Sequence, residues 1–374
     1  MTNKRILLIH GDRLLQQLYR EKLEESGFAV DVRVDLQDAE ANPTPRTPEV
    51  ILLDLVHPQG TVTDFITALR AQPATEGVPI LILPTTLLEL ANTAIIAGAN
   101  KVIQSEGSPI ASIINAIKVS LGQPELGKAS NAALFKAEEF WINSVFSNAI
   151  QIINQMRHCL PGLTAKPPEQ TALRNLWFLA HGFAERALIL PTRTLAQFLG
   201  ALDLLLQDLY EMPEQLNPST LRTVGQSLDF IATISNPDTL GRLASPSAAK
   251  ILVVDDEPSA IQFISAALNL AGLQCQSAES PAVALEKLGT GRWDLIFLDV
   301  GLPQVDGFGL CTKIRAIENL KTTPIVFITG MATFKNKATA CLSGGNDFVG
   351  KPFNLCELGV KALTWLYRGQ LKMV

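Results

Sequence analysis

Short apolar runs alternate with segments of helical periodicity towards both ends of the chain. In the C-terminal third, strand-like runs lie at Ile251–Val254, Leu295–Leu298, Ile325–Ile328 and Asp347–Val349, with a weaker one near Leu273–Ser277. These runs lack apolar–polar alternation, which is typical of strands covered by helices on both faces. The pattern predicts βαβ units in a doubly wound parallel sheet.

The N-terminal end repeats this layout at an offset of about 245 residues, the difference between Asp299 and Asp54. The matching pairs are KRILLIHGD (4–12) with AKILVVDDE (249–257), PEVILLDL (48–55) with RWDLIFLDV (292–300), and VPILIL (78–83) with TPIVFI (323–328). A repeat this long does not indicate a solenoid; it predicts two copies of one α/β fold.

The middle of the chain has no strand-like run and predicts successive amphipathic helices. They are expected near 132–158, 169–189, 192–211 and 218–234. Proline-containing breaks separate them, at 160–170, 190–192 and 211–219. Four helices with short connections predict an antiparallel bundle.

Linker-like composition at 121–130 and 244–250 separates these regions. The predicted domains are therefore 1–122, 130–243 and 249–374. The overall class is α/β plus all-α, with two doubly wound parallel-sheet domains flanking a helical bundle.

Composition narrows the function classes. The formal net charge is −5, and no basic run with interleaved aromatics is present, so nucleic acid is not expected as a direct partner. The five cysteines are scattered without CxxC spacing, which indicates reduced thiols and a cytoplasmic location. No apolar stretch approaches the roughly 18 residues of a membrane span, and the N-terminal apolar run is short for a signal peptide, so no membrane insertion is expected.

Acidic residues follow the predicted C-terminal strands. Asp255 and Asp256 end the first strand and Asp299 ends the third. Since the carboxyl ends of parallel strands form one edge, the three carboxylates should meet there. They would repel one another unless a cation joined them, and Mg²⁺ is the hard, oxygen-preferring ion that suits such a site.

Two further residues belong to the same edge. Thr329 ends the fourth strand and Lys351 follows the fifth, so a hydroxyl and an ammonium face the acids. Phosphoryl transfer requires positioning and charge neutralisation, which this set supplies, with Asp299 as the nucleophile. The alternative, that each acid merely caps a helix or a turn, is weakened by five matching positions in order.

The motifs VVDDE, LDVGLPQVDGFGL, ITG and GKPF resemble those of response regulator receiver domains over about 249–370. The resemblance implies a flavodoxin-like sheet of order 2-1-3-4-5, Asp299 as phosphoacceptor, and Mg²⁺ held by Asp255, Asp256, Asp299 and the carbonyl of Gly301. It also implies Thr329 as switch hydroxyl and Phe348 as the aromatic that changes rotamer with it. The phosphodonor would be a sensor histidine kinase or a histidine phosphotransfer (HPt) protein.

The N-terminal copy lacks most of this equipment. His10 and Gly11 replace the acid pair, Pro84 replaces the threonine, and Ser105 or Glu106 stands at the lysine position, so that only Asp54 remains. Without those charges, phosphoryl transfer should lose its electrostatic stabilisation. This copy is predicted to be a pseudo-receiver that serves in interaction, with Asp54 as a leftover carboxylate; homodimerisation is left open.

The helical middle contains His181 beside an apolar stripe in TALRNLWFLAHGFAERALIL. About 100 residues around it resemble an HPt domain, in which such a histidine carries a phosphoryl group. The family's lysine and glycine after the histidine are Ala184 and Glu185 here, and the carboxylate would repel a phosphoryl group. Arg186 points elsewhere on the helix. Phosphotransfer through His181 and an inactive, dimerising bundle both stay open.

The sequence therefore predicts a two-component phosphorelay protein with protein–protein output to a downstream receiver or effector. It is not expected to be an enzyme beyond slow loss of phosphate from Asp299. An adaptor or scaffold is the main alternative, and a transcription regulator is a weaker one.

Overall fold

The computed structural model describes most of the chain. The described ranges are 4–42, 44, 46–56, 61–84, 88–103, 109–124, 139–188, 190, 193–303, 305–330 and 343–372, without the side chains of 88, 89, 109 and 139–142. Contacts divide the chain into two units. The first contains 1–149 with 178–196, and the second contains 150–177 with 197–374. Each unit holds one parallel sheet.

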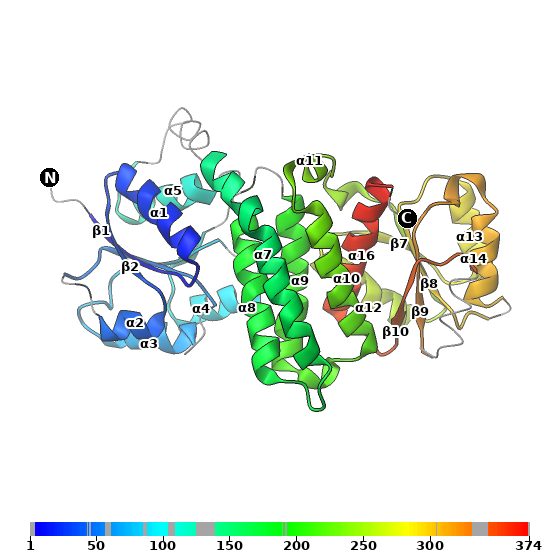
Figure 1. The fold of residues 1–374 in the computed structure, drawn as a ribbon, viewed down its shortest axis with the longest axis horizontal. Coiled ribbons are helices and arrows are strands. Elements are labelled where there is room, and N and C mark those ends of the chain that lie inside the picture. The colour runs from blue at the N-terminus through cyan, green and yellow to red at the C-terminus, as the bar shows by residue number, and fades with distance from the viewer. Residues whose placement is uncertain are drawn as a thin grey trace. The chain divides into compact units, whose positions relative to one another are not determined.

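The first unit contains the sheet of the N-terminal copy. Its elements are β1 (Arg5–Ile9), α1 (Arg13–Glu25), β2 (Ala29–Arg33), α2 (Leu36–Ala41), β3 (Val50–Leu53), α3 (Val62–Ala71), β4 (Ile80–Ile82), α4 (Leu88–Ala97), β5 (Lys101–Val102) and α5 (Pro109–Ser120). All strand pairs are parallel, in the order β2-β1-β3-β4-β5. Apolar residues of α2, α3 and α4 pack on one face of the sheet, while α1 and α5 lie together on the other (Figure 1).

The second unit contains the sheet of the C-terminal copy. Its elements are β6 (Ile251–Val254), α12 (Pro258–Leu270), β7 (Cys275–Ala278), α13 (Pro281–Gly289), β8 (Leu295–Asp299), α14 (Gly307–Arg315), η3 (Glu318–Leu320), β9 (Ile325–Thr329), β10 (Asp347–Gly350) and α16 (Leu355–Gln370). The strand order is β10-β9-β8-β6-β7, again all parallel. Helices α13 and α14 bury their apolar faces against one side, and α12 packs with α16 on the other (Figure 1). The predicted 2-1-3-4-5 order is confirmed for both sheets.

The middle of the chain is helical, as predicted. Its elements are α7 (Glu139–Leu163), α8 (Gln170–Ala187), α9 (Thr194–Glu211), η1 (Pro213–Gln215), α10 (Pro218–Ile234), α11 (Pro237–Leu240) and η2 (Pro246–Ala248). The bundle itself stays a prediction. Asn217 caps α10 and Thr220 returns the bond in a reciprocal capping box, which explains the sharp start after the proline-containing break.

One predicted boundary is wrong. The first of these helices was expected to end near 158, before the 160–170 break, but α7 continues through Pro161 to Leu163. A proline this close to the C-terminal end removes only one late helical hydrogen bond, and Thr164 ends the helix by donating its N–H to the Pro161 carbonyl. Residues 132–138, which were included in the prediction, lie outside the described residues.

The two sheet copies share a partly buried arginine clamp that the sequence comparison did not single out. In the second copy Arg315 donates to the carbonyls of Gly344, Leu320 and Thr323 and to the Asn346 side chain. In the first copy Arg70 donates to the Gly98 carbonyl and the Asn100 side chain in the same way, and to carbonyls at 75, 76 and 78. Gly98 and Gly344 both have positive φ, which an L side chain would strain.

The matching numbers strengthen the repeat, because 315 minus 70 gives the same offset of 245 as 299 minus 54. Asn100 and Asn346 each also accept the backbone N–H that opens the fourth strand of their own sheet. The correspondence therefore extends from the apolar strands to a specific polar network.

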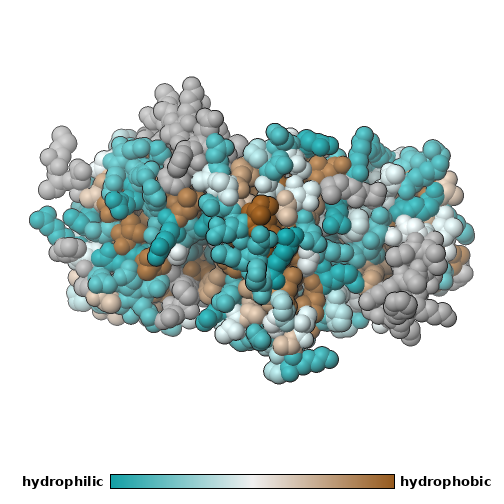
Figure 2. Space-filling model, in the orientation of Figure 1, coloured by the Kyte–Doolittle hydropathy of each residue, from teal (hydrophilic) through white to brown (hydrophobic). Residues whose placement is uncertain are grey.

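The surface is mixed in character. The face drawn in Figure 2 is largely hydrophilic, with small separate hydrophobic patches. Within the described ranges, none of the helices combines the length and apolar composition needed to cross a membrane.

Candidate functional site

The predicted acidic residues meet at the carboxyl edge of the second sheet. Asp255 follows β6, Asp299 is the last residue of β8, and both are buried, whereas Asp256 is exposed. One carboxylate oxygen from each of the three lies within 4.8 Å of the others. The expectation that these side chains gather at one edge is confirmed by the geometry.

Lys351 joins two of these acids. Its Nζ lies 2.9 Å from Asp255 Oδ2 and 2.9 Å from Asp299 Oδ1. Burial raises the pKa of Asp299, the hydrogen bond and charge of Lys351 oppose that rise, and Asp255 adds to it. Burial alone would lower the pKa of Lys351, but its bonds to the two acids outweigh this and raise it. The lysine is therefore held protonated next to the carboxylate.

The loop after Asp299 is shaped by two glycines. The N–H of Gly301 donates to Asp299 Oδ2 at 2.6 Å, which fixes the carboxylate. A Cβ on Gly307 would come within 2.2 Å of the Asp299 carbonyl oxygen, so only glycine lets α14 start this close to the strand. Thr329 ends β9 at the same edge and is buried.

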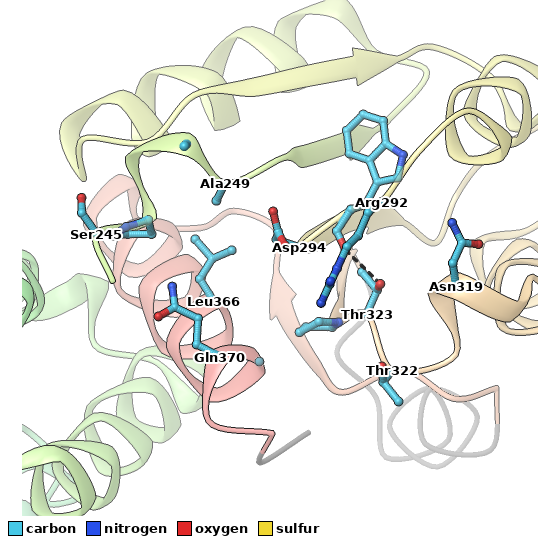
Figure 3. Close-up of a pocket in the computed structure, with 14 residues that line it drawn as sticks. Ser245, Ala249, Arg292, Asp294, Asn319, Thr322, Thr323, Leu366 and Gln370 are labelled. Atoms are coloured by element: carbon cyan, nitrogen blue, oxygen red, sulfur yellow. Dashed lines mark hydrogen bonds between the residues drawn. The ribbon is translucent and has the colours of Figure 1, made fainter. Parts of the chain in front are cut away.

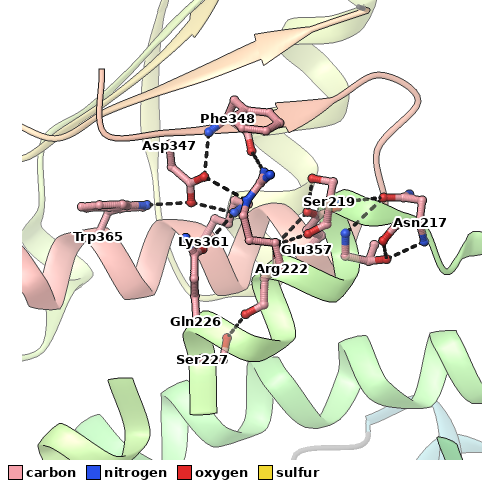
Figure 4. A network of polar contacts seen from close by, with 12 residues as sticks. Asn217, Ser219, Arg222, Gln226, Ser227, Asp347, Phe348, Glu357, Lys361 and Trp365 are labelled. Carbon is pink, nitrogen blue, oxygen red and sulfur yellow. Dashed lines mark hydrogen bonds and ion pairs between the residues drawn. The ribbon is translucent and has the colours of Figure 1, made fainter. Parts of the chain in front are cut away.

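Phe348, the predicted switch aromatic, lies in β10 under a cation. The guanidinium carbon of Arg222, from α10, lies 3.7 Å from the centre of the Phe348 ring, and Arg222 also donates to the Phe348 carbonyl at 2.7 Å. A second contact joins Arg222 Nε to Asp347 Oδ1 at 3.5 Å. Figure 4 shows Arg222 reaching from α10 to this strand.

The polar network continues along α16 (Figure 4). Lys361 Nζ lies 2.7 Å from Asp347 Oδ2, and Glu357 accepts hydrogen bonds from Ser219 at 2.6 Å and Thr223 at 2.7 Å. Burial alone would raise the pKa of Asp347, but the attraction of Lys361 and Arg222 outweighs it and lowers that pKa. Most of these polar groups are paired across the contact between α10 and the second sheet copy, although Arg222 Nε and Glu357 Oε2 are buried without a hydrogen-bond partner among the described residues.

The corresponding edge of the first sheet carries a different set. Its members are His10, Asp54, His181 and Glu185, and each is at most 5% exposed. His181 Nε2 lies 3.7 Å from Asp54 Oδ1 and 3.5 Å from Glu185 Oε1, and His10 Nε2 lies 3.4 Å from Glu185 Oε2. The sequence placed His181 at the border of a helix stripe; the structure buries it.

One carboxyl of this set is strongly perturbed. Burial, reinforced by the charge of Asp54, raises the pKa of Glu185 to about 7, although His181 and His10 act in the opposite direction. The predicted repulsive carboxylate therefore gains a proton more readily than an ordinary glutamate. His10, Asp54 and Glu185 are also close enough to surround a cation.

The hydrogen bonding of His10 does not suit metal ligation. Its Nδ1 accepts the N–H of Asp12 at 3.0 Å, so the neutral ring carries its proton on Nε2, the atom that faces Glu185. A metal-ligating histidine usually donates its other nitrogen's proton. This cluster is therefore suited to sharing protons rather than holding an ion.

A separate cavity of about 540 Å³ lies at the opposite edge of the second sheet. Figure 3 shows Asp294, Thr323, Arg292 and Gln370 around it, near the amino ends of the strands. Thr323 donates to the Trp293 carbonyl at 3.0 Å, and Asp294 Oδ2 accepts the N–H of Lys250. These two side chains are bonded to the backbone of the fold, and the cavity does not include Asp255, Asp256 or Asp299 in its lining.

Sequence reasoning missed Arg222 and did not connect His10 with Glu185. Both depend on contacts between residues more than 100 positions apart. The replacement of an acid by His10 was visible in the repeat, but its partner was not. Ser105 and Glu106, aligned with the lysine, lie outside the described residues.

Comparison with known proteins identifies the family of the second sheet copy. Residues 251–362 match the family model of the response regulator receiver domain. The DNA-binding dual master transcriptional regulator RpaA of Synechocystis sp. is 32% identical over 125 residues, which is 32% of this chain and 49% of RpaA. The probable transcriptional regulator ycf27 of Cyanidium caldarium is 34% identical over 122 residues, covering 33% of this chain and 48% of that protein.

Among solved structures, chemotaxis response regulator CheY4 of Vibrio cholerae has 33% identity, covers 32% of this chain and 98% of that chain, and has a TM-score of 0.30. The chain spans about half the length of the curated relatives it matches. The assignment rests on the family model and on the identity within its bounds. Residues 251–362 therefore form a response regulator receiver domain.

Proposed function

We propose that Asp299 accepts a phosphoryl group from a phosphohistidine of a sensor kinase or HPt protein, and that output is through protein–protein contacts. The observation that carries this proposal is Lys351, whose ammonium lies 2.9 Å from both Asp255 and Asp299. A lone aspartate at a strand end would be a helix cap, whereas an aspartate paired with a lysine and a second acid has the groups that phosphoryl transfer requires.

The chemistry follows from these groups. An oxygen of Asp299 attacks phosphorus, the new O–P bond makes an acyl phosphate, and the P–N bond breaks as the donor imidazole leaves. Lys351 neutralises charge on the transferred group, as electrostatic stabilisation requires. Thr329, at the end of β9, would respond as switch hydroxyl.

The acidic residues suit Mg²⁺. Three carboxylates with one ammonium leave an excess of negative charge at the edge, and their oxygens converge within 4.8 Å. Asp255, Asp256, Asp299 and the carbonyl of Gly301 would hold the ion. Bound Mg²⁺ would supply further positive charge to the phosphoryl oxygens.

Beyond slow loss of phosphate from Asp299, we propose no enzymatic activity. The output would start at Phe348, since Arg222 of α10 stacks on its ring and binds its carbonyl. A change in the Phe348 rotamer would remove the cation–π contact and loosen α10. Phosphorylation would thereby be read by the helical segment and by the proteins that it contacts.

The remaining parts of the chain fit an adaptor. The first copy, with the same strand order but His10 and Pro84 in place of acid and threonine, would be a pseudo-receiver. The helices between would be an HPt-like domain, in the three-domain division 1–122, 130–243 and 249–374. The expected absence of nucleic acid gains no support from relatives named as DNA-binding or transcriptional regulators, and stays a prediction.

The test is labelling by acetyl phosphate with Mg²⁺. We expect an acyl phosphate on the wild type and on Asp54→Ala, and none on Asp299→Ala. Asp54→Ala is the matched control, because it removes the equivalent carboxylate of the other copy. Undiminished labelling of Asp299→Ala would refute the site assignment.

A further inference from the structure

Helix α8 rests on the carboxyl edge of the first sheet through an ion pair. Arg186 Nε lies 2.6 Å from Asp12 Oδ2, and the side chains are 19% and 9% exposed. Asp12 also caps α1 by accepting the N–H groups of Leu14 and Leu15. The arginine thus binds a carboxylate that is already fixed, which makes the contact well defined.

A glycine allows the helix to approach. Gly182 lies one turn before Arg186 on α8, and a Cβ added there would stand 3.5 Å from Asp12 Oδ2, at ordinary contact distance. A methyl group is therefore tolerated, but a longer acidic side chain would meet the Asp12 carboxylate. The space between α8 and Asp12 at this position therefore holds at most a methyl side chain.

This approach buries His181. Its Nε2 faces Asp54 Oδ1 at 3.7 Å and Glu185 Oε1 at 3.5 Å, and the residue is 3% exposed. A phosphoryl group on that nitrogen would have to occupy space already filled by two carboxyl groups. It would also bring negative charge against Asp54, at a site where burial weakens screening.

The other members hold the arrangement together. The Nε2 proton of His10 points to Glu185, and Asp54 Oδ1 accepts the N–H of Leu55 at 2.6 Å. Backbone N–H groups thus compensate Asp54, and the imidazole of His10 lies 3.4 Å from Glu185 Oε2. Asp54, a leftover carboxylate by sequence, is part of the surface that receives α8.

We propose that the carboxyl edge of the first sheet is a docking surface for the His181 face of α8, and that it withholds His181 from phosphodonors and receivers. The edge at which the second copy gathers its acids and Lys351 is used in the first copy to cover a histidine of the same chain. This proposal rests on the proposed HPt-like identity of α8, but it does not depend on phosphorylation of Asp299.

The experiment compares Gly182→Glu with Gly182→Ala in the full chain. A glutamate at 182 repels Asp12 and offers Arg186 a partner four residues away on its own helix, so α8 should leave the edge. Alanine improves helix propensity without either effect. Arg186→Gln is a second variant that should open the contact, because it removes the ion pair with Asp12. Glutamine has a helix propensity similar to that of arginine.

Two probes are used on each protein. Diethyl pyrocarbonate, followed by peptide mass spectrometry, compares His181 with His158, which is exposed and serves as an internal reference. Phosphoramidate, a small phosphodonor that releases ammonia as the new bond to histidine forms, measures phosphorylation of His181. Acetyl phosphate labelling of Asp299 is recorded in parallel, together with circular dichroism.

We expect His181 of the wild type and Gly182→Ala to react roughly tenfold or more slowly than His158, and to approach its rate in Gly182→Glu and Arg186→Gln. The proposal is overturned if His181 reacts as fast as His158 in the wild type, or if neither opening variant raises its rate. Loss of Asp299 labelling alone would refute the proposed function and leave this result standing.

Discussion

The two sheet copies have the same strand order, but the residues at the carboxyl edges of their sheets differ. Both have the 2-1-3-4-5 order and the arginine clamp, at Arg70 and Arg315. At the second edge, Asp255 and Asp299 flank a lysine. At the first edge, His10 and Asp54 face a helix that carries His181. The two copies therefore share the clamp and the core of the fold, while the residues at their carboxyl edges differ.

The largest expected effect tests the shared scaffold. Arg315→Gln and Arg70→Gln each leave several carbonyls without their charged donor, and each should lower the free energy of unfolding of its own unit by about 2 kcal/mol. Denaturant unfolding, with a local probe in each unit, measures both. If Arg70→Gln had no effect while Arg315→Gln destabilised, the two scaffolds would not be equivalent.

The next effect tests the docking edge through pH. Because the pKa of Glu185 is raised from 4.5 to about 7, the folded first unit binds a proton that the unfolded chain has released. The stability that this proton contributes is therefore fully present below about pH 4.5 and is lost as the pH rises through about 7. Glu185→Gln, which stays neutral, should remove a slope worth on the order of 2 kcal/mol.

Denaturant unfolding between pH 5 and pH 8 measures this slope. The groups that face Glu185 are His10, Asp54, His181 and Tyr19, and they stay unchanged in the variant. Equal slopes for the wild type and Glu185→Gln would contradict the assignment of a buried, proton-binding carboxyl at the docking edge.

The smallest effect concerns the readout of the second copy. Arg222→Gln removes the cation–π contact to Phe348, worth about 1 kcal/mol. In the wild type, the rate of amide hydrogen exchange in α10 should rise after treatment with acetyl phosphate and Mg²⁺. In Arg222→Gln, this rate should already be high before the treatment and should not change with it. Arg157→Gln, which removes the exposed pair with Asp229, is the control. A full response in Arg222→Gln would refute this route.

Much of the fold could be predicted because it is encoded locally. Unbroken apolar runs specify buried strands, and the repeat at an offset of 245 residues predicts the same strands in both copies. The acids at 255, 256 and 299 could be placed together because all strands of such a sheet end at one edge. Pro161 was misjudged because a late proline costs a helix little.

The unpredicted features depend on tertiary contacts between distant segments. Arg222 meets Phe348 across 126 positions, and Arg186 meets Asp12 across 174. No local pattern distinguishes these arginines from solvent-exposed ones. For the same reason Glu185 looked like a defect in a phosphotransfer helix, whereas in the structure it fills a buried site with His10 and His181.

The central claim is that only the second edge takes phosphate, and direct mapping tests it best. The wild type is incubated with acetyl phosphate and Mg²⁺, reduced with borohydride, which converts aspartyl phosphate to homoserine, and digested for mass spectrometry. We predict homoserine at position 299 and an unmodified aspartate at position 54. Homoserine at 54, or its absence at 299, would contradict the account.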